Sequence, residues 1–144
     1  MQHLTDLETT LGHTFANQDL LRQALVHRSF LNENPNFPLG QNERLEFLGD
    51  VVVGLFVSEL LFEKFPEARE GALTQRRAAL VCESTLSAIA GELGLGEAIH
   101  LGRGEELSGG REKPRLLSGA LEASVLITKA DGGDFKNIIQ MVCE

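Results

Sequence analysis

Residues 43–65 constrain the fold more than any other segment, because they read as one long helix that is apolar on most of its sides. The helix is expected to stop before Pro66, since the residue before a proline disfavours helical geometry. Its apolar side chains include Phe47, Leu48, Val51, Val52, Leu55 and Phe56. A helix of this kind must be covered all round. We therefore expect a second copy of the chain to complete the cover in a twofold homodimer.

Three carboxylates stand at the start of this apolar helix, at Glu43, Glu46 and Asp50. Their spacing places them on one narrow stripe, because a helix turns once in about 3.6 residues. Like charges so close repel one another, and their burial is costly without a partner. A hard divalent cation, Mg²⁺ or Mn²⁺, suits such oxygen ligands. A solvated acidic patch favoured by the helix dipole is the alternative.

Composition fits one domain with a real core, because the chain has 144 residues and 42% of them are hydrophobic. No apolar run reaches the roughly 18 residues of a membrane span, and the N-terminus lacks the pattern of a signal peptide. The only cysteines, Cys82 and Cys143, have no metal-ligand spacing and are expected to be reduced thiols. These features predict a cytoplasmic protein with no membrane partner.

Helical spacing recurs along the chain and predicts an all-α fold, with no strand alternation of useful length. Asn17 is placed to cap a helix that begins near Asp19, and Asp134 to cap a final helix. The glycine-rich segment 102–114 is expected to be a flexible loop, as is the proline-containing segment 32–41. The remaining helices are expected at 4–11, 19–27, 73–81, 84–93 and 115–129.

The stretch Asn42–Asp50, which reads Asn-Glu-Arg-Leu-Glu-Phe-Leu-Gly-Asp, resembles the signature of the ribonuclease III family of double-stranded-RNA endonucleases. Other segments resemble that family in order and spacing: 24–30, 70–74, 101–105, 108–111, 120–123 and 131–133. The resemblance covers nearly all of residues 5–140. It implies a ribonuclease III-type endonuclease domain over residues 1–144, with no double-stranded-RNA-binding domain in this chain.

The resemblance also implies which side chains hold the metal. Glu46, Asp50 and Glu122 match the ligands of a catalytic Mg²⁺, for which Mn²⁺ can substitute, and Asp50 and Glu122 are the expected catalytic residues. The alternative for Glu122 is a helix acid paired with Arg115 or Lys129, which lie seven residues away on either side.

Four further residues match family positions with less defined roles. Glu43 and Glu70 match acids near the metal, although Glu43 could equally be a helix-start acid and Glu70 could cap the turn that follows it. Phe47 resembles an aromatic residue that packs across the dimer interface, and its alternative is an ordinary core residue. His27 is expected to be a hydrogen-bonded structural histidine, because metal-activated water makes a general base unnecessary.

Two positions depart from the family pattern. Gly119 stands where the family places an aspartate, and Arg115 stands where a small hydroxyl residue is common. The missing carboxylate removes one negative charge from the expected metal site. We therefore expect slow cleavage that needs more Mg²⁺ than a complete site, or that prefers Mn²⁺.

The net charge of −8 opposes binding of a polyanion, so RNA contacts must come from local basic residues and bridging metal. The candidates are the pair Arg76 and Arg77 and a second cluster of Arg103, Arg111, Lys113 and Arg115. Acids at Glu105, Glu106 and Glu112 are interleaved with the second cluster, and a solvated loop is the alternative.

The combined prediction is a metal-dependent endoribonuclease that cleaves double-stranded RNA to 5′-phosphate and 3′-hydroxyl ends in RNA processing. The first alternative is a catalytically weakened or inactive relative that binds RNA or the ribosome. Gly119, Arg115 and the missing RNA-binding domain favour it, and the three retained acids oppose it. The second is an acidic helical protein-interaction domain, which the charge permits but the signature does not explain.

Overall fold

The computed structural model describes residues 2–143, except for the side chains of residues 2, 3, 137 and 143. In this part of the chain the regular elements are helices, and extended pairing is limited to one bridge between Val26 and His100. The all-α prediction is confirmed. The elements are α1 (Gln2–Leu11), α2 (Gln18–Ala24), α3 (Arg28–Glu33), α4 (Glu43–Lys64), α5 (Glu70–Leu80), α6 (Glu83–Glu92), α7 (Leu95–Ala98), α8 (Arg103–Leu107), η1 (Gly110–Glu112), α9 (Pro114–Ala130) and α10 (Lys136–Cys143).

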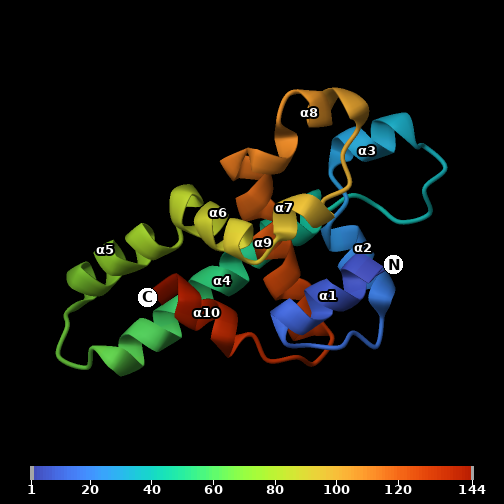
Figure 1. The fold of residues 1–144 in the computed structure, drawn as a ribbon. Helices are drawn as coiled ribbons and strands as arrows, with labels where there is room; N and C mark the ends of the chain where they lie inside the picture. The colour runs from blue at the N-terminus through green and yellow to red at the C-terminus, as the bar shows by residue number, and fades with distance from the viewer. Residues whose placement is uncertain (1, 144) are drawn as a thin grey trace.

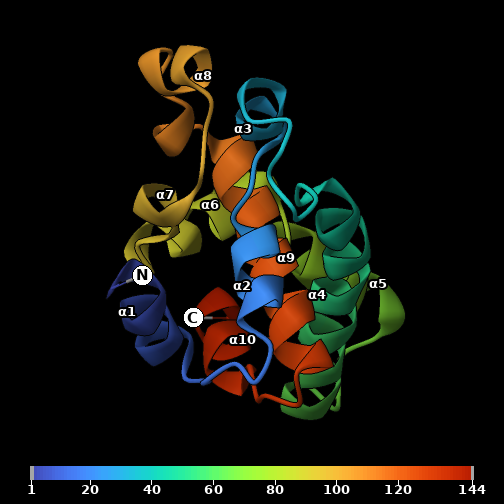
Figure 2. The ribbon, with the colours of Figure 1, turned by 90° about the vertical axis from the view of Figure 1, so that its right-hand side faces the viewer.

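Helix α9 runs through the middle of the fold, and the other helices surround it (Figure 1, Figure 2). Every residue from 117 to 125 is buried, and α9 packs most extensively against α4 and α6. Two polar residues in this helix form hydrogen bonds within the helix itself. The hydroxyls of Ser124 and Thr128 donate to the carbonyls of Ala120 and Ser124, each at 2.7 Å. The helix can therefore be buried without leaving these groups unpaired.

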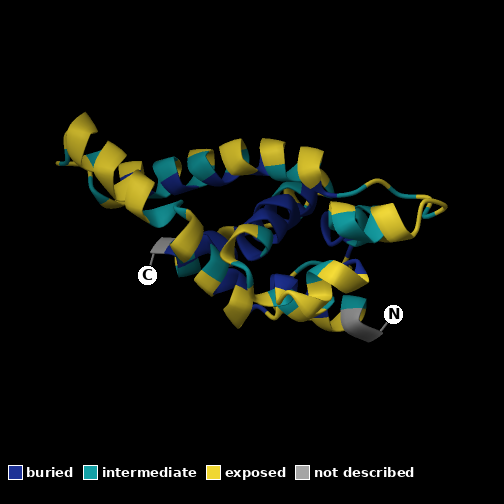
Figure 3. Cartoon of the chain, turned by 90° about the horizontal axis from the view of Figure 1, so that it is seen from above, coloured by how far each residue is buried: buried dark blue, intermediate teal, exposed yellow. Residues whose placement is uncertain are grey.

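Helix α4 ends within one residue of its predicted boundary. Its inner side, which includes Val53, Val57 and Leu61, is buried. Its outer side is exposed along its length, as the yellow residues of the long helix at the edge of Figure 3 show. Phe47 and Phe62 are 78% and 73% exposed, respectively. The described residues thus leave one apolar side of α4 uncovered.

The start of the chain is fastened to the end of α9 by Asp131. Its carboxylate lies 2.7 Å from His13 Nε2 and accepts backbone hydrogen bonds from Ala16 at 2.9 Å and Asn17 at 3.3 Å. The predicted cap at Asn17 is confirmed, and the side chain of Asp134 binds the first residue of α10. Asn17 accepts from the backbone of Asp19, and Asp134 accepts from the backbone of Lys136.

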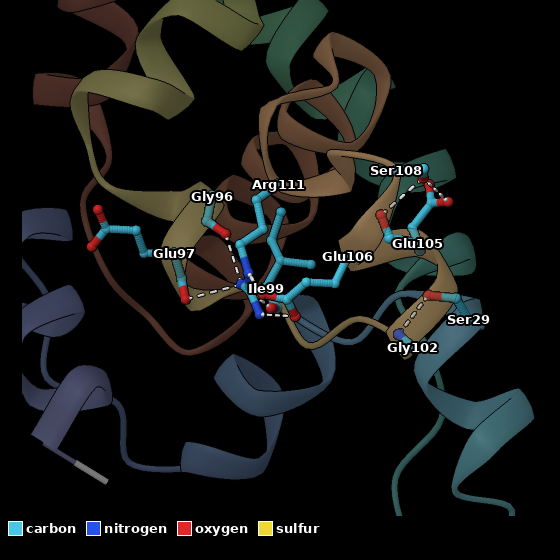
Figure 4. Close-up of polar contacts among 9 residues, drawn as sticks. All are labelled: Ser29, Gly96, Glu97, Ile99, Gly102, Glu105, Glu106, Ser108 and Arg111. Carbon is cyan, nitrogen blue, oxygen red and sulfur yellow. Dashed lines mark hydrogen bonds and ion pairs between the residues drawn. The ribbon is translucent and has the colours of Figure 1, made fainter.

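The prediction of a flexible loop over residues 102–114 was wrong, because this segment contains α8 and η1. Arg111 holds the segment in place (Figure 4). Its guanidinium donates to the carbonyls of Gly96, Glu97 and Ile99 at 2.6–3.1 Å. It also pairs with Glu106, with Nε 2.8 Å from Oε1. A side chain that binds three carbonyls of α7 and the residue after it fixes the segment in one position.

A second difference concerns residues 19–33. The predicted helix 19–27 ends at Ala24, and α3 begins at Arg28. His27 separates them because it caps α3, where its Nδ1 accepts from the backbone N–H of Ser29 at 3.2 Å.

Two observations bear on compartment. Among residues 2–143, no helix is both long enough and apolar enough to cross a membrane. Cys82 has a free thiol, and the side chain of Cys143 lies outside the described part of the chain.

Candidate metal centre

An open cleft lies where the start of α4 meets α9, and it collects the three predicted metal ligands. Glu46 and Asp50 of α4 and Glu122 of α9 all line it. A smaller adjoining hollow is lined by the same three acids. The structure therefore brings together side chains that are more than seventy positions apart in sequence. The other residues of the main cleft are His27, Arg28, Gln41, Asn42, Glu43, Phe47, Arg115 and Leu116.

Gly49 allows the two helices to meet this closely. A side-chain carbon on Gly49 would overlap the backbone carbonyl group of Glu122, so only glycine fits this crossing. Gly49 precedes Asp50 on α4 and contacts the backbone of Glu122 on α9. This contact therefore fixes the separation of the two backbone segments that carry the carboxylates of Asp50 and Glu122. Gly54 has no such role, because a side-chain carbon there meets nothing within 4 Å. The sequence-based inference of a close approach holds for Gly49 and not for Gly54.

Asn42 anchors the start of α4. Its buried side-chain amide donates to the carbonyl of Ala24 at 2.9 Å, and its backbone N–H donates to Val26 at 2.8 Å. Its own carbonyl accepts from the backbone of Glu46 at 2.8 Å. The first turn of α4, which carries Glu46, is therefore tied to the connection between α2 and α3.

Glu122 is a buried acid with an unusual ionisation. Only 8% of it is exposed. Burial, a hydrogen bond with Asp50, and the negative charges of Asp50 and Glu46 raise the pKa of Glu122 to about 9. The alternative of a helix ion pair fails, since neither Arg115 nor Lys129 pairs with Glu122 in the described residues.

Glu46 lies directly against Gly119. A side-chain carbon on Gly119 would stand 2.5 Å from Glu46 Oε2, so the glutamate occupies the space that a larger residue would need. Burial raises the pKa of Glu46, the charge of Arg115 lowers it, and Glu43 and Asp50 raise it further. Glu46 is thus a carboxylate in an acidic setting, with one positive charge nearby.

The donor set can be compared with the needs of a divalent cation. Carboxylate oxygens are the ligands that Mg²⁺ prefers, and the raised pKa of Glu122 reflects the cost of a third negative charge beside Glu46 and Asp50, which a bound cation would offset. Their oxygens do not form a ready cage, because within residues 2–143 no group of three His, Cys, Asp or Glu side chains has the geometry of a metal site. The residues fit a divalent cation in type and charge.

Comparison with known proteins identifies the family of this chain. The family model described as Ribonuclease-III-like matches residues 17–133. The chain belongs to the ribonuclease III-like family. Ribonuclease 3 of Syntrophobacter fumaroxidans is 50% identical over 130 residues, which are 90% of this chain and 54% of that relative. Ribonuclease 3 of Geobacter metallireducens is 49% identical over 130 residues, or 90% and 53% of the two chains. The chain spans about half the length of these curated relatives.

Solved structures show the same ribonuclease III fold. The nuclease domain of ribonuclease III from Campylobacter jejuni matches with a TM-score of 0.85 and 41% identity, over 99% of this chain and 92% of that one. A second structure of that domain has a TM-score of 0.83 and 42% identity, over 96% of this chain and 92% of that one. That structure is described for flexibility in a region involved in dimer formation. The fold expected from the signature is therefore the fold observed.

The remaining predicted residues of this ribonuclease III-like chain lie in different places. Glu43 lines the cleft and is held by Gln41, whose Nε2 donates to Glu43 Oε2 at 2.8 Å. Phe47 lines the cleft as well and begins the exposed side of α4. Glu70 begins α5, which follows the far end of α4 (Figure 1), and it is not among the residues that line the cleft. His27 is a capping residue, and burial lowers its pKa.

Most of the predicted RNA-binding residues already have partners inside the protein or lie away from the cleft. Arg111 binds the three carbonyls of the α7 region, and Lys113 Nζ lies 3.2 Å from Glu105 Oε1. Arg103 begins α8 and is exposed. Arg115, which the sequence placed near the site and among the possible phosphate contacts, lines the cleft, and so does Arg28, which the sequence did not single out. The available signal was the spacing of Arg115, two helical turns before Glu122 on the same face.

Proposed function

We propose that this chain is the catalytic domain of a metal-dependent endoribonuclease that cleaves double-stranded RNA. One observation carries the proposal. Glu46, Asp50 and Glu122 come from two helices and meet in one open cleft. The two helices cross at Gly49, where their backbones are so close that only glycine fits. Membership of the ribonuclease III-like family supports the reaction class.

In this proposal the three carboxylates hold Mg²⁺, with Mn²⁺ as a substitute. When bound, the ion activates water and neutralises charge on the phosphate that is cleaved. Asp50 and Glu122 would orient that water toward the phosphate. Cleavage leaves 5′-phosphate and 3′-hydroxyl ends.

We propose that the active form is a homodimer. The outer side of α4 exposes large apolar side chains along the whole helix, which is about 33 Å long. Large exposed apolar patches mark interaction sites. In a twofold dimer the same apolar stripe of a second copy would pack against this one. Phe47 belongs both to this stripe and to the cleft, so the second subunit borders the site. The members of the stripe are Phe47, Leu48, Val51, Leu55 and Phe62.

Cleavage of a long RNA duplex with Mg²⁺ tests this function. The parent protein should release products with 5′-phosphate ends, and Glu46→Gln and Asp50→Asn should abolish release while keeping the fold, as judged by circular dichroism. Glu92→Gln is the matched control, because Glu92 is an exposed acid at the end of α6. Cleavage that persists in Glu46→Gln and Asp50→Asn would show that another site, or a contaminant, is responsible.

The competing function is RNA binding without cleavage. Gly119 favours this competing function, because it lacks the carboxylate that the family pattern places at that position. Duplex binding by a parent protein that cleaves with neither Mg²⁺ nor Mn²⁺ would establish it.

A further inference from the structure

Arg115 is a cation of the cleft that the protein itself does not pair. It is the second residue of α9, is exposed, and lines both the main cleft and the smaller hollow beside the three acids. Within the described part of the chain its guanidinium has no hydrogen-bond or ion-pair partner. Its positive charge is close enough to act on Glu46, yet the two groups are not in contact.

The neighbouring basic residues Arg111 and Lys113, unlike Arg115, have partners within the protein. Arg111 and Lys113 are both bound to glutamates of α8, and Arg111 also binds three carbonyls. Their donors are used in holding the segment 102–113 together. Arg115 keeps its five donors available, in a rigid fork that matches the geometry of a phosphate group.

A phosphate needs such a group in this cleft. The chain has a net charge of −8, and Glu46 and Asp50 add local repulsion to any polyanion that approaches. A divalent cation offsets part of this repulsion. A guanidinium on the cleft wall offsets a further part of this repulsion, and it can also bind a phosphate oxygen directly.

We propose that Arg115 binds a backbone phosphate of the nucleic acid in this cleft. The inference rests on the proposed function and deepens it, since it names the residue that brings the RNA backbone to the carboxylates. The competing hypothesis is that Arg115 only offsets part of the negative charge of Glu46 and does not contact the substrate.

The first arm of the test measures duplex binding. A fluorescent RNA duplex is titrated with protein in Ca²⁺, with gels to verify that the duplex stays intact, over a series of salt concentrations. Arg115→Ala should weaken binding several-fold and reduce the slope of log affinity against log salt by about 1. Arg115→Lys should restore most of the slope. Lys129→Ala is the charge-matched control, because Lys129 is exposed on the same helix about 20 Å away.

The second arm measures Mn²⁺ binding by electron paramagnetic resonance, without RNA and without turnover. Removal of a positive charge near the carboxylates should tighten Mn²⁺ binding in Arg115→Ala. Damage to the cleft would weaken it. Opposite changes in the two affinities, weaker for RNA and tighter for Mn²⁺, are therefore the expected signature.

Three outcomes would overturn the inference. An unchanged salt slope in Arg115→Ala, with tighter Mn²⁺ binding, would establish the competing hypothesis. A joint loss of RNA and Mn²⁺ affinity would show a structural role. A parent protein that binds neither the duplex nor Mn²⁺ would overturn the proposed function as well, which separates that failure from a failure of Arg115 alone.

Discussion

The backbone carbonyl of Glu122 lies where the first side-chain carbon of residue 49 would stand if that residue were not glycine. The two helices that carry the candidate ligands are thus in backbone contact at the site itself. Because this contact is between main-chain atoms, it cannot relax by a change of rotamer. The relative positions of Asp50 and Glu122 depend on it.

Gly49→Ala should therefore lower the free energy of unfolding by about 1–3 kcal/mol, because α4 and α9 must move apart. It should also weaken Mn²⁺ binding. Gly54→Ala is the matched control on the same helix, where the added carbon meets nothing within 4 Å. It should raise the free energy of unfolding by about 0.5–1 kcal/mol, because alanine is the better helix former. Urea denaturation measures both. Equal stability of the two variants would contradict the importance of the crossing.

Restoring a carboxylate at residue 119 should strengthen metal binding. Gly119→Asp must displace the Glu46 carboxyl group, which lies within 3.0 Å of the added carbon, but that group is the free end of a flexible side chain. We expect tighter Mg²⁺ binding, measured by calorimetry, and faster duplex cleavage at low Mg²⁺. Gly119→Ala displaces Glu46 without adding a ligand, so it should weaken binding. If Gly119→Asp is no better than the parent at any metal concentration, Gly119 does not limit the site.

A charge on the outer side of α4 should separate the proposed dimer. Leu55 is half exposed on that side, so Leu55→Glu should leave the subunit folded. Burying an unpaired carboxylate in an apolar interface is costly, and we expect the mass by light scattering at micromolar concentration to fall to that of one chain. Leu55→Met, which stays apolar, should keep the parent mass. A parent protein that is already monomeric would refute the dimer.

The Asp131 contacts should make stability depend on pH. Hydrogen bonds from His13 and from the backbone of Ala16 and Asn17 lower the pKa of Asp131. A carboxyl group with a lowered pKa in the folded state stabilises the protein above its unfolded pKa of about 3.9 and loses that effect as the pH falls through the folded value. Asp131→Asn should therefore lower the melting temperature most near pH 7, and the gap to the parent should close below pH 4. A gap that stays constant from pH 7 to pH 3 would contradict this.

Arg111→Ala should act mainly on stability. The change leaves the carbonyls of Gly96, Glu97 and Ile99 without their charged donor, and we expect a loss of about 1–3 kcal/mol in the free energy of unfolding. Arg103→Ala removes the same charge from an exposed position and should leave stability unchanged. Reduced duplex binding by Arg111→Ala with unchanged stability would instead favour the direct RNA contact expected from the sequence.

Long helices were the most predictable part of the fold. The boundaries of α4 and α9 each fell within one residue of those expected, because their apolar pattern extends over several turns. The short helices α3, α7 and α8 were missed. A helix of four to six residues is not stable alone, and each of these depends on contacts with distant residues, such as those of Arg111.

For the candidate site, the sequence placed the three acids through a motif and through the position of Glu122 within an apolar helix. It did not reveal that Glu46 rests on Gly119, or that Arg28 lines the same cleft. Such relationships depend on how two helices cross. A single sequence carries no direct signal for a crossing, apart from glycines such as Gly49, whose close contact cannot be told from the open surroundings of Gly54 without coordinates.

The central position of α9 has a consequence for synthesis of the chain. This helix is the hub of the core, yet it begins at Pro114, after most of the other helices have been made. Until it leaves the ribosome, α4 and α6 lack their main packing partner, and their apolar residues are open to wrong associations. We therefore expect the core to close only after α9 has been made, rather than step by step from the first residue.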